Sequence, residues 1–319
     1  MRDVPGLVQA ARSGDPRAVA RLITLVENAD PALPEVAAAL APHTGRARVV
    51  GLTGAPGVGK STTTNELVRA LRARGRRIGV LAVDPSSPYT GGAILGDRVR
   101  MQDHATDAGV YIRSMSARGH LGGLAAATPQ AVRVLEGAGC DVVLVETVGV
   151  GQAEVEVASL ADTTLVLLAP GMGDAIQAVK AGILEVADVF VVNKADRDGA
   201  DATYRDILGM LGLAARGPGE WRPQVVRAVA AKGEGIDEVL DAIDKHQEWL
   251  VDSGELGRRR EARAAAEVEA IALGTLRDRI GSLREGTALS TLAAQVAAGT
   301  RDPFSAAATL LAGLRVADS

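Results

Sequence analysis

The sequence has little cysteine, few aromatic residues and no excess of positive charge. Its single cysteine, Cys140, excludes a disulfide within the chain and cannot form a thiolate metal site alone. It directly precedes an apolar strand pattern, where we expect a structural role. Aromatic residues make up 2% of the 319 residues, so a surface that stacks single-stranded bases is not expected. The formal net charge of −4 gives no basic footprint, and we expect no nucleic-acid partner.

Long apolar runs are also missing. The first 40 residues lack the apolar core of a signal peptide, and no run approaches the ~20 residues of a membrane span. We therefore expect no membrane partner and place the chain in the cytoplasm. At 47% apolar and 23% charged residues, the composition is that of an ordinary globular protein. Its length is ample for a buried core.

Residues 1–45 are predicted to form a helical N-terminal extension. Asp15 fits an N-cap and Pro16 fits the first helical position, because apolar residues follow at helical spacing.

Residues 46–252 are predicted to form one α/β domain with a mostly parallel sheet covered by helices. Short apolar runs alternate there with longer amphipathic stretches. Unbroken apolar strands separated by helices indicate a parallel sheet that is buried on both faces. The runs are VVGLT (49–53), IGVLAVD (78–84), DVVLVE (141–146), TLVLLAP (164–170), VFVVNK (189–194) and QVVRAVA (224–230).

Residues 253–319 read as a second helical extension, which is alanine-rich and charged. Asp302-Pro303 has the form of a new helix start. The basic cluster 258–260 is flanked by Glu255 and Glu261, which favours a solvated helix face over a nucleic-acid patch.

The stretch GAPGVGKS (54–61) matches the phosphate-binding pattern G-x-x-x-x-G-K-[ST] between a strand and a helix. Its glycines let backbone N–H groups point at phosphate oxygens, Lys60 brings positive charge to the β- and γ-phosphates, and the Ser61 hydroxyl can bind Mg²⁺. The helix start adds its positive dipole end. The motif predicts a nucleoside triphosphate site formed by Gly54, Ala55, Pro56, Gly57, Val58, Gly59, Lys60, Ser61 and Thr62.

The base is predicted by NKAD (193–196), at the end of the fifth apolar run. Asp196 can accept two hydrogen bonds from guanine N1–H and the exocyclic amine, which adenine cannot supply. Asn193 and Lys194 would brace this loop and lie along the base. Ligands of such sheets bind beyond the carboxyl ends of the strands, which is where NKAD is expected.

A second contact to the base is expected at Ala230-Ala231-Lys232, after the next strand. GTPases usually carry Ser-Ala-Lys there. The serine is missing, but the contact to guanine O6 is normally a backbone amide, which alanine supplies equally well.

Three carboxylates are candidates for the Mg²⁺ region: Asp84 at the end of the second run, Asp97, and Glu146 at the end of the third. Hard cations prefer oxygen ligands, and Mg²⁺ keeps several waters, so some of these acids would act through water. Asp84 could instead end its strand as a turn residue, because Pro85 follows it.

The order of six segments resembles the methylmalonyl-CoA mutase-associated GTPases of the MeaB/ArgK family. The resemblance is strong over about residues 45–250. DPSS with GGAILGD and ETVGVGQ are its distinctive parts. The segments are GAPGVGKSTTT, VLAVDPSSPYTGGAILGDRVRM, LGGLAAAT, VVLVETVGVGQAE, LAPGMGDAIQAVKAGILEVAD and VVNKAD.

The resemblance implies a GTPase domain that binds GTP or GDP with Mg²⁺, with Asp84, Asp97 and Glu146 in the metal region. It implies that Gly149 lies in a second switch with Gln152 near it. It also implies a further switch at 171–180, with Lys180 as a catalytic contributor. An exposed helix lysine is the alternative role for Lys180.

The family further implies a chaperone of adenosylcobalamin-dependent acyl-CoA mutases and a C-terminal arm that forms a homodimer. The chain is too short to contain a mutase as well, so we expect the mutase to be a separate chain, with methylmalonyl-CoA mutase as the default. Val150 follows Gly149 and cannot orient water. We therefore expect slow basal hydrolysis that the partner accelerates.

Four other functions fit the sequence less well. A protein-targeting GTPase would need a methionine-rich helical surface, but the whole chain has five methionines. A nonenzymatic scaffold is disfavoured because every phosphate-contacting position is intact. A metal-insertion GTPase needs a metal-handling cluster, but the four histidines are scattered. An ATP-using kinase linked to basic amino-acid transport is disfavoured by NKAD, which is typical of guanine selection.

Overall fold

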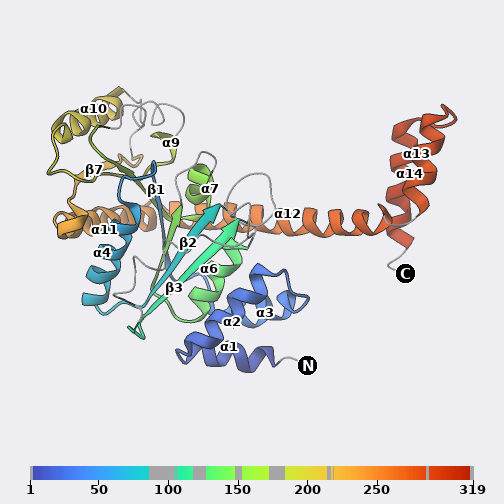
Figure 1. Ribbon diagram of the computed structural model, residues 1–319, viewed down its shortest axis with the longest axis horizontal. Coiled ribbons are helices and arrows are strands. Elements are labelled where there is room, and N and C mark those ends of the chain that lie inside the picture. Colours follow the sequence, from blue (N-terminus) through green and yellow to red (C-terminus); the bar gives the residue numbers. More distant parts are fainter. Residues whose placement is uncertain are drawn as a thin grey trace. The chain divides into compact units, whose positions relative to one another are not determined.

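The computed structural model (Figure 1) describes residues 3–85, 104, 106–117, 127–147, 153–171, 184–213, 217, 219–284 and 287–316. The chain divides into two compact units, Met1–Arg259 and Arg260–Ser319. The first unit contains the sheet and is described first.

Seven strands form one sheet in which every pairing is parallel, which confirms the predicted α/β class. The strand order is β3-β2-β4-β1-β5-β6-β7. The strands are β1 (Arg48–Thr53), β2 (Ile78–Pro85), β3 (Val110–Ala117), β4 (Val142–Thr147), β5 (Thr163–Leu168), β6 (Val189–Val192) and β7 (Gln224–Arg227).

All six apolar runs form strands, but β3 was not predicted. Its sequence VYIRSMSA is interrupted by Arg113 and two serines. β3 lies at the edge of the sheet and pairs only with β2. An edge strand does not need the continuous apolar run that marks a central strand.

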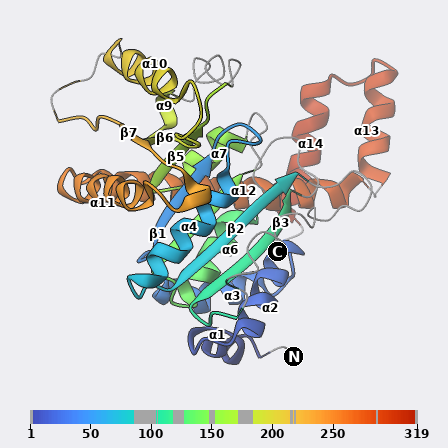
Figure 2. The ribbon, with the colours of Figure 1, turned by 60° about the vertical axis from the view of Figure 1, so that its left-hand side comes forward.

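Residues that alternate along each strand point to opposite faces of the sheet and build two large cores, and a smaller third cluster lies around Phe190. Val143 and Val145 point into one core, and Val142 and Leu144 point into the other. The first core also contains residues of the helices α1 (Val4–Arg12), α2 (Pro16–Glu27), α3 (Leu33–Leu40) and α6 (Thr128–Gly137). The second core also contains residues of α4 and α11. Figure 2 shows these helices on the two sides of the strands. The helices after β1 are α4 (Lys60–Ala73), α6 (Thr128–Gly137), α7 (Ala153–Leu160), α9 (Leu184–Val186), α10 (Ala200–Leu213) and α11 (Ile236–Asp252).

The N-terminal extension is helical, as predicted, with α1 (Val4–Arg12), α2 (Pro16–Glu27) and α3 (Leu33–Leu40). The Asp15 carboxylate accepts a hydrogen bond from Arg17 N at 2.9 Å, which confirms Asp15 as an N-cap. Leu22 and Ile23 of α2 are fully buried in the same core as α6. The extension is therefore an integral part of the first unit.

The long helix α12 (Glu255–Arg284) begins in the first unit and continues into the second. Its Arg259 guanidinium makes two hydrogen bonds to the Asp188 carboxylate, both 3.1 Å long. The first turn of α12 thus belongs to the first unit, seven residues beyond the boundary expected at 252.

The second unit continues with α13 (Thr287–Ala297) and α14 (Pro303–Val316). Asp302 Oδ1 accepts hydrogen bonds from the N–H groups of Phe304 and Ser305, both at 2.9 Å, which confirms the predicted helix start. In the part of the chain that the structure describes, no helix combines the length and apolar character needed to cross a membrane.

Candidate nucleotide-binding site

The phosphate-loop sequence connects the last residue of β1 to the first turn of α4, at the carboxyl edge of the sheet. Gly54 has φ +137°, and a Cβ there would lie 2.3 Å from Leu167 O of β5. Gly59 has φ +97°, and its Cβ would lie 2.4 Å from Asn193 Nδ2. Both positions therefore require glycine for conformation and for space. The loop is packed tightly between β5 and the NKAD segment.

Lys60 lies within this loop and its side chain is largely buried. Its Nζ donates to Gly54 O at 2.7 Å and to Ala55 O at 3.0 Å. Val58, which lies between Ala55 and the start of α4 in the sequence, is fully buried, whereas Pro56, Gly57 and Thr62 are exposed. The Lys60 ammonium thus lies beside the loop. A phosphate group bound by the N–H groups of this loop would be close to it.

Ser61 and Glu146 are in direct contact, as the prediction of a shared Mg²⁺ region requires. Ser61 Oγ donates to Glu146 Oε1 at 2.6 Å. Thr64 Oγ1, one turn further along α4, lies 2.8 Å from Glu146 Oε2 and 3.0 Å from Lys60 O. Glu146 is 4% exposed, so these hydroxyls hold a buried carboxylate at the end of β4.

The donor set fits a magnesium ion. A serine hydroxyl and a carboxylate are hard oxygen ligands, and both lie beside the loop expected to hold the phosphates. Ser61 and Glu146 are the described residues that would hold Mg²⁺.

Asn193 joins three segments of the site. Its Nδ2 donates to Val58 O of the phosphate loop at 2.8 Å. Its Oδ1 accepts from Ala230 N at 3.0 Å, and its own N–H donates to Leu168 O of β5 at 2.8 Å. The buried amide therefore ties the phosphate loop to both base-loop segments, which is the bracing geometry expected of it.

Lys194 and Asp196 lie on the exposed side of the same loop. Lys194 adopts φ +56°, and its Nζ donates to Gly57 O at 2.6 Å. Asp196 forms an ion pair with Lys232 at 3.0 Å. The hydrogen bond from Lys232 holds the pKa of the Asp196 carboxyl below its usual value, and Asp196 raises the pKa of Lys232. Asp196 and Lys232, which are both expected near the base, therefore lie side by side in the fold. Asp196 is an ionised acceptor at neutral pH.

The segment 230–232 forms a short 3-10 turn beside NKAD. Ala230 N–H is used by Asn193 Oδ1, as described above. Ala231 N–H has no acceptor among the described residues, so Ala231, of the two alanines, can donate from its backbone to a ligand.

For Asp84, another residue predicted for the site, the structure describes the backbone. The backbone of Asp84 pairs with Ser116 of β3, one residue beyond the pairing of Val83 with Thr147 of β4. Asp84 thus ends its strand at the same edge as Glu146. Asp97, Gly149, Gln152 and Lys180 lie outside the described residues.

Sequence reasoning missed Thr64, which holds the second oxygen of Glu146. Its signal was present, because Thr64 follows Ser61 by three positions, and residues at this spacing share one face of a helix.

Known proteins share this sequence and fold. The family described as "Methylmalonyl Co-A mutase-associated GTPase MeaB" matches residues 19–284. A protein of Pyrococcus abyssi is 47% identical over 308 residues, which cover 96% of this chain and 95% of that protein. The GTPase ArgK of Escherichia coli is 39% identical over 267 residues, covering 81% and 80% respectively. The crystal structure of an LAO/AO transport system kinase is similar, with a TM-score of 0.72 and 27% identity over 99% of both chains.

Proposed function

This chain belongs to the MeaB family of methylmalonyl-CoA mutase-associated GTPases, and we propose that it is a G-protein chaperone of an adenosylcobalamin-dependent acyl-CoA mutase. In this proposal GTP hydrolysis gates the loading of intact cofactor onto the mutase and protects the loaded enzyme. The mutase is a separate chain, with methylmalonyl-CoA mutase as the first candidate. The family description supports this partner, and the nucleotide site described above supports the gating reaction.

The observation that carries the proposal is the position of Asn193 between the phosphate loop and the base loop. Its two amide contacts link Val58 to Ala230, so one side chain connects the phosphate loop to the base loop. In the proposed complex, Asp196 accepts hydrogen bonds from guanine N1–H and the amine, and Ala231 N–H donates to guanine O6. Lys194 and Lys232 would flank the base.

The proposed reaction is in-line attack of water on the γ-phosphorus. A bond forms between the water oxygen and phosphorus, and the bond to the bridging oxygen breaks, which gives GDP and phosphate. Lys60 would offset negative charge on the transferring group. A Mg²⁺ held by Ser61 and Glu146, with Asp84 and Asp97 acting directly or through water, would neutralise charge on the β- and γ-phosphates when bound.

Slow basal hydrolysis is part of the proposal, because Val150 follows Gly149 and an apolar side chain cannot orient the attacking water. Binding of the mutase would then accelerate hydrolysis through the segments that contain Gly149, Gln152 and Lys180. Gln152 and Lys180 are the proposed sources of the missing polar group.

We further propose that the second unit forms the interface of a homodimer. Among its described residues, only Leu292 and Ala306 are buried apolar side chains. Large apolar side chains are instead exposed, including Val268 (68%), Ile271 (56%) and Phe304 (87%). Burial of these side chains against a second copy would remove apolar surface from water, which is favourable.

The proposal is tested by loading a purified apo-mutase with adenosylcobalamin in the presence of this chain. Cofactor transfer is followed by absorbance with GTP, GDP or a nonhydrolysable GTP analogue. Methylmalonyl-CoA and isobutyryl-CoA mutases are compared as recipients. We expect loading of one of them to depend on the nucleotide, and loading that is identical in all three nucleotide states would contradict gating.

The alternative of an ATP-using kinase rests on the name of the similar LAO/AO transport system kinase structure. It predicts that ATP displaces GTP well in a competition assay. The alternative of a metal-insertion GTPase requires a metal-handling cluster, and the described residues contain no group of three His, Cys, Asp or Glu side chains suited to one.

A further inference from the structure

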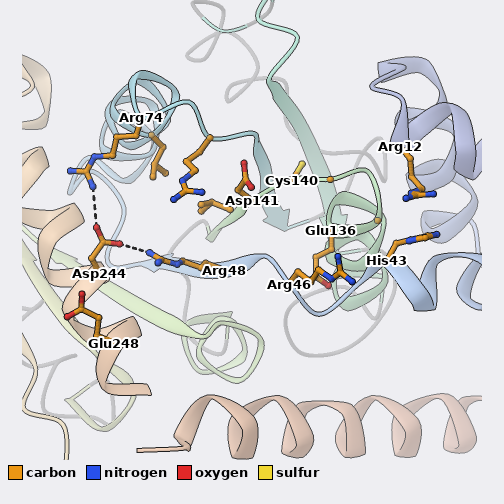
Figure 3. A pocket seen from close by; sticks show the side chains of 15 residues that line it. Arg12, His43, Arg46, Arg48, Arg74, Glu136, Cys140, Asp141, Asp244 and Glu248 are labelled. Atoms are coloured by element: carbon orange, nitrogen blue, oxygen red, sulfur yellow. Dashed lines mark hydrogen bonds and ion pairs between the residues drawn. The ribbon is translucent and has the colours of Figure 1, made fainter. Parts of the chain in front are cut away.

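A cavity of about 680 Å³ lies in the first unit, at the edge of the sheet opposite the phosphate loop (Figure 3). Arg48 and Val142, the first residues of β1 and β4, line it, whereas the phosphate loop follows the last residue of β1. The cavity is therefore separate from the nucleotide site. Its volume is within the range of roughly 300–1,000 Å³ that is usual for small-molecule sites.

Positive side chains are concentrated in this cavity, although the chain as a whole carries a net charge of −4. Five arginines line it, together with one histidine and four carboxylates. The basic residues come from three separate segments, namely the end of α1, residues 43–48, and the end of α4 with the turn that follows it. They are Arg12, His43, Arg46, Arg48, Arg74 and Arg76.

One wall is held in place by Asp244 of α11. Its carboxylate forms ion pairs with Arg48 and, at 3.2 Å, with Arg74, and Figure 3 shows both guanidinium groups directed at it. Each guanidinium has five N–H donors in a fixed plane. One carboxylate cannot use them all. Arg74 also forms an ion pair with Asp237 at 3.4 Å, so two aspartates balance the charge of the two arginines. What the pair adds at the cavity wall is N–H donors beyond those that these contacts use.

The other wall carries Arg12, His43 and Arg46, with Glu136 nearby (Figure 3). Within the described part of the chain, the side chains of Arg46 and Arg76 have no hydrogen-bond or ion-pair partner. Asp141 also lines the cavity, and its Oδ2 accepts the backbone N–H of Arg77 at 2.7 Å.

Helix ends explain only part of this cluster. Arg12 is the last residue of α1 and Arg74 is the C-cap of α4, so each offsets the negative end of a helix. Arg46 lies in the connection to β1, and Arg76 lies beyond the C-cap of α4. Neither residue is in a last helical turn.

We propose that this cavity binds a small molecule that carries two or more linked phosphoryl groups. Guanidinium groups bind phosphate oxygens in a bidentate manner, and here they stand on two walls of one cavity. A ligand with charge at more than one point can engage both walls. Leu71 and Val142 supply apolar surface for the rest of such a molecule.

The test is isothermal titration calorimetry with inorganic tripolyphosphate as the probe. The whole chain is saturated with GDP, so that the phosphate loop is blocked. The titration is repeated with a Lys60→Ala variant, which further excludes binding of the probe at the phosphate loop. The double variant Arg46→Gln/Arg76→Gln is compared with Arg205→Gln/Arg222→Gln. The control pair changes net charge equally at exposed arginines that do not line the cavity. Thermal melting verifies that each variant is folded.

We expect GDP-saturated wild-type protein and the Lys60→Ala variant to bind tripolyphosphate. The Arg46→Gln/Arg76→Gln pair should lose affinity by about tenfold or more, while the control pair keeps it. Citrate, which carries three carboxylates, should bind more weakly. Three results overturn the proposal: no binding to the GDP-saturated chain, equal losses in the two double variants, or preference for citrate.

Discussion

The hydroxyl of Ser61 donates a hydrogen bond of 2.6 Å to Glu146, so the end of β4 and the first turn of α4 meet beside the phosphate loop. The glutamate occupies a position where many nucleotide switches carry a shorter aspartate. Its longer side chain reaches both Ser61 and Thr64 of α4. Changes at Glu146 should therefore act on the metal region rather than on base recognition.

Replacing Glu146 with glutamine should raise the Mg²⁺ concentration needed for half-maximal GTP turnover by about 10- to 100-fold. The amide keeps the shape of the carboxylate but removes its charge. The measurement is the GTPase rate across a Mg²⁺ titration. Thr64→Val is the matched control, because it removes one contact to Glu146 and leaves the carboxylate in place. An unchanged Mg²⁺ requirement in Glu146→Gln would refute the metal assignment.

Replacing Asp196 with asparagine should weaken GTP binding by about 10- to 100-fold and favour xanthosine triphosphate. Guanine presents two donors to this position, and xanthine replaces the amine donor with a carbonyl that can accept from the new amide. Competition binding with the two nucleotides measures the exchange. Unchanged GTP affinity would falsify the base assignment.

Replacing Gly59 with alanine should damage base selection as well as the phosphate loop, because the new Cβ would lie 2.4 Å from Asn193 Nδ2. Gly57→Ala is the control. It has a similar positive φ of +81° but no heavy atom within 4 Å of its Cβ. Both variants carry backbone strain of about 1–3 kcal/mol. Only Gly59→Ala should lower the preference for GTP over ATP, and equal preference in the two variants would contradict the bracing role of Asn193.

The buried His246 should make the first unit less stable in acid. Burial lowers the pKa of His246 to about 4, with Arg259 acting in the same direction and Asp188 and Asp162 opposing them. An unfolded histidine titrates near 6.5, so between about pH 6.5 and 4 the unfolded chain binds a proton that the folded chain does not. The free energy of unfolding should fall across that window by up to about 3 kcal/mol.

Urea unfolding at several pH values measures this loss. Both tryptophans lie beside the imidazole, with ring centroids 4.7 Å away for Trp221 and 5.7 Å away for Trp249, so their fluorescence reports on this region. His246→Gln should show a smaller decline between pH 6.5 and 4. Equal slopes for the two proteins would show that His246 is not the group responsible.

Truncation should separate the proposed dimer interface from the nucleotide site. A chain of residues 1–262 keeps the Arg259–Asp188 contacts and should sediment as a monomer that still binds GTP, while the full chain sediments as a dimer. A chain of residues 1–252 loses Arg259 and should be less stable than the 1–262 chain. A 1–262 chain that remained dimeric would move the interface into the first unit.

The sequence predicted the parts of the fold that local rules determine. Central strands must be apolar on both faces, so the five central strands were visible as runs, and Asp15 and Asp302 were recognisable as helix starts. The edge strand β7 was visible as well, whereas β3 escaped because Arg113 and two serines interrupt its apolar residues. The contact between Arg259 and Asp188 was not predictable either, because the two residues are 71 positions apart in the sequence.

The candidate site combines short motifs with contacts between them. Phosphate and base motifs are contiguous, so spacing alone predicts Lys60, Ser61 and Asp196 as site residues. The contacts between the motifs cannot be predicted from spacing. Asn193 binds Val58 and Ala230, and its Nδ2 lies so close to Gly59 that this position must be small. These contacts join segments that only the folded sheet brings together.

GTP turnover by this chain, measured with and without a purified adenosylcobalamin-dependent acyl-CoA mutase, tests the central claim most directly. The Asp196→Asn variant serves as the control that the nucleotide site is responsible. We predict slow turnover of GTP alone and a clear increase when the cognate mutase is added, with the increase lost in the variant. Equal rates with and without every mutase of this class would contradict it.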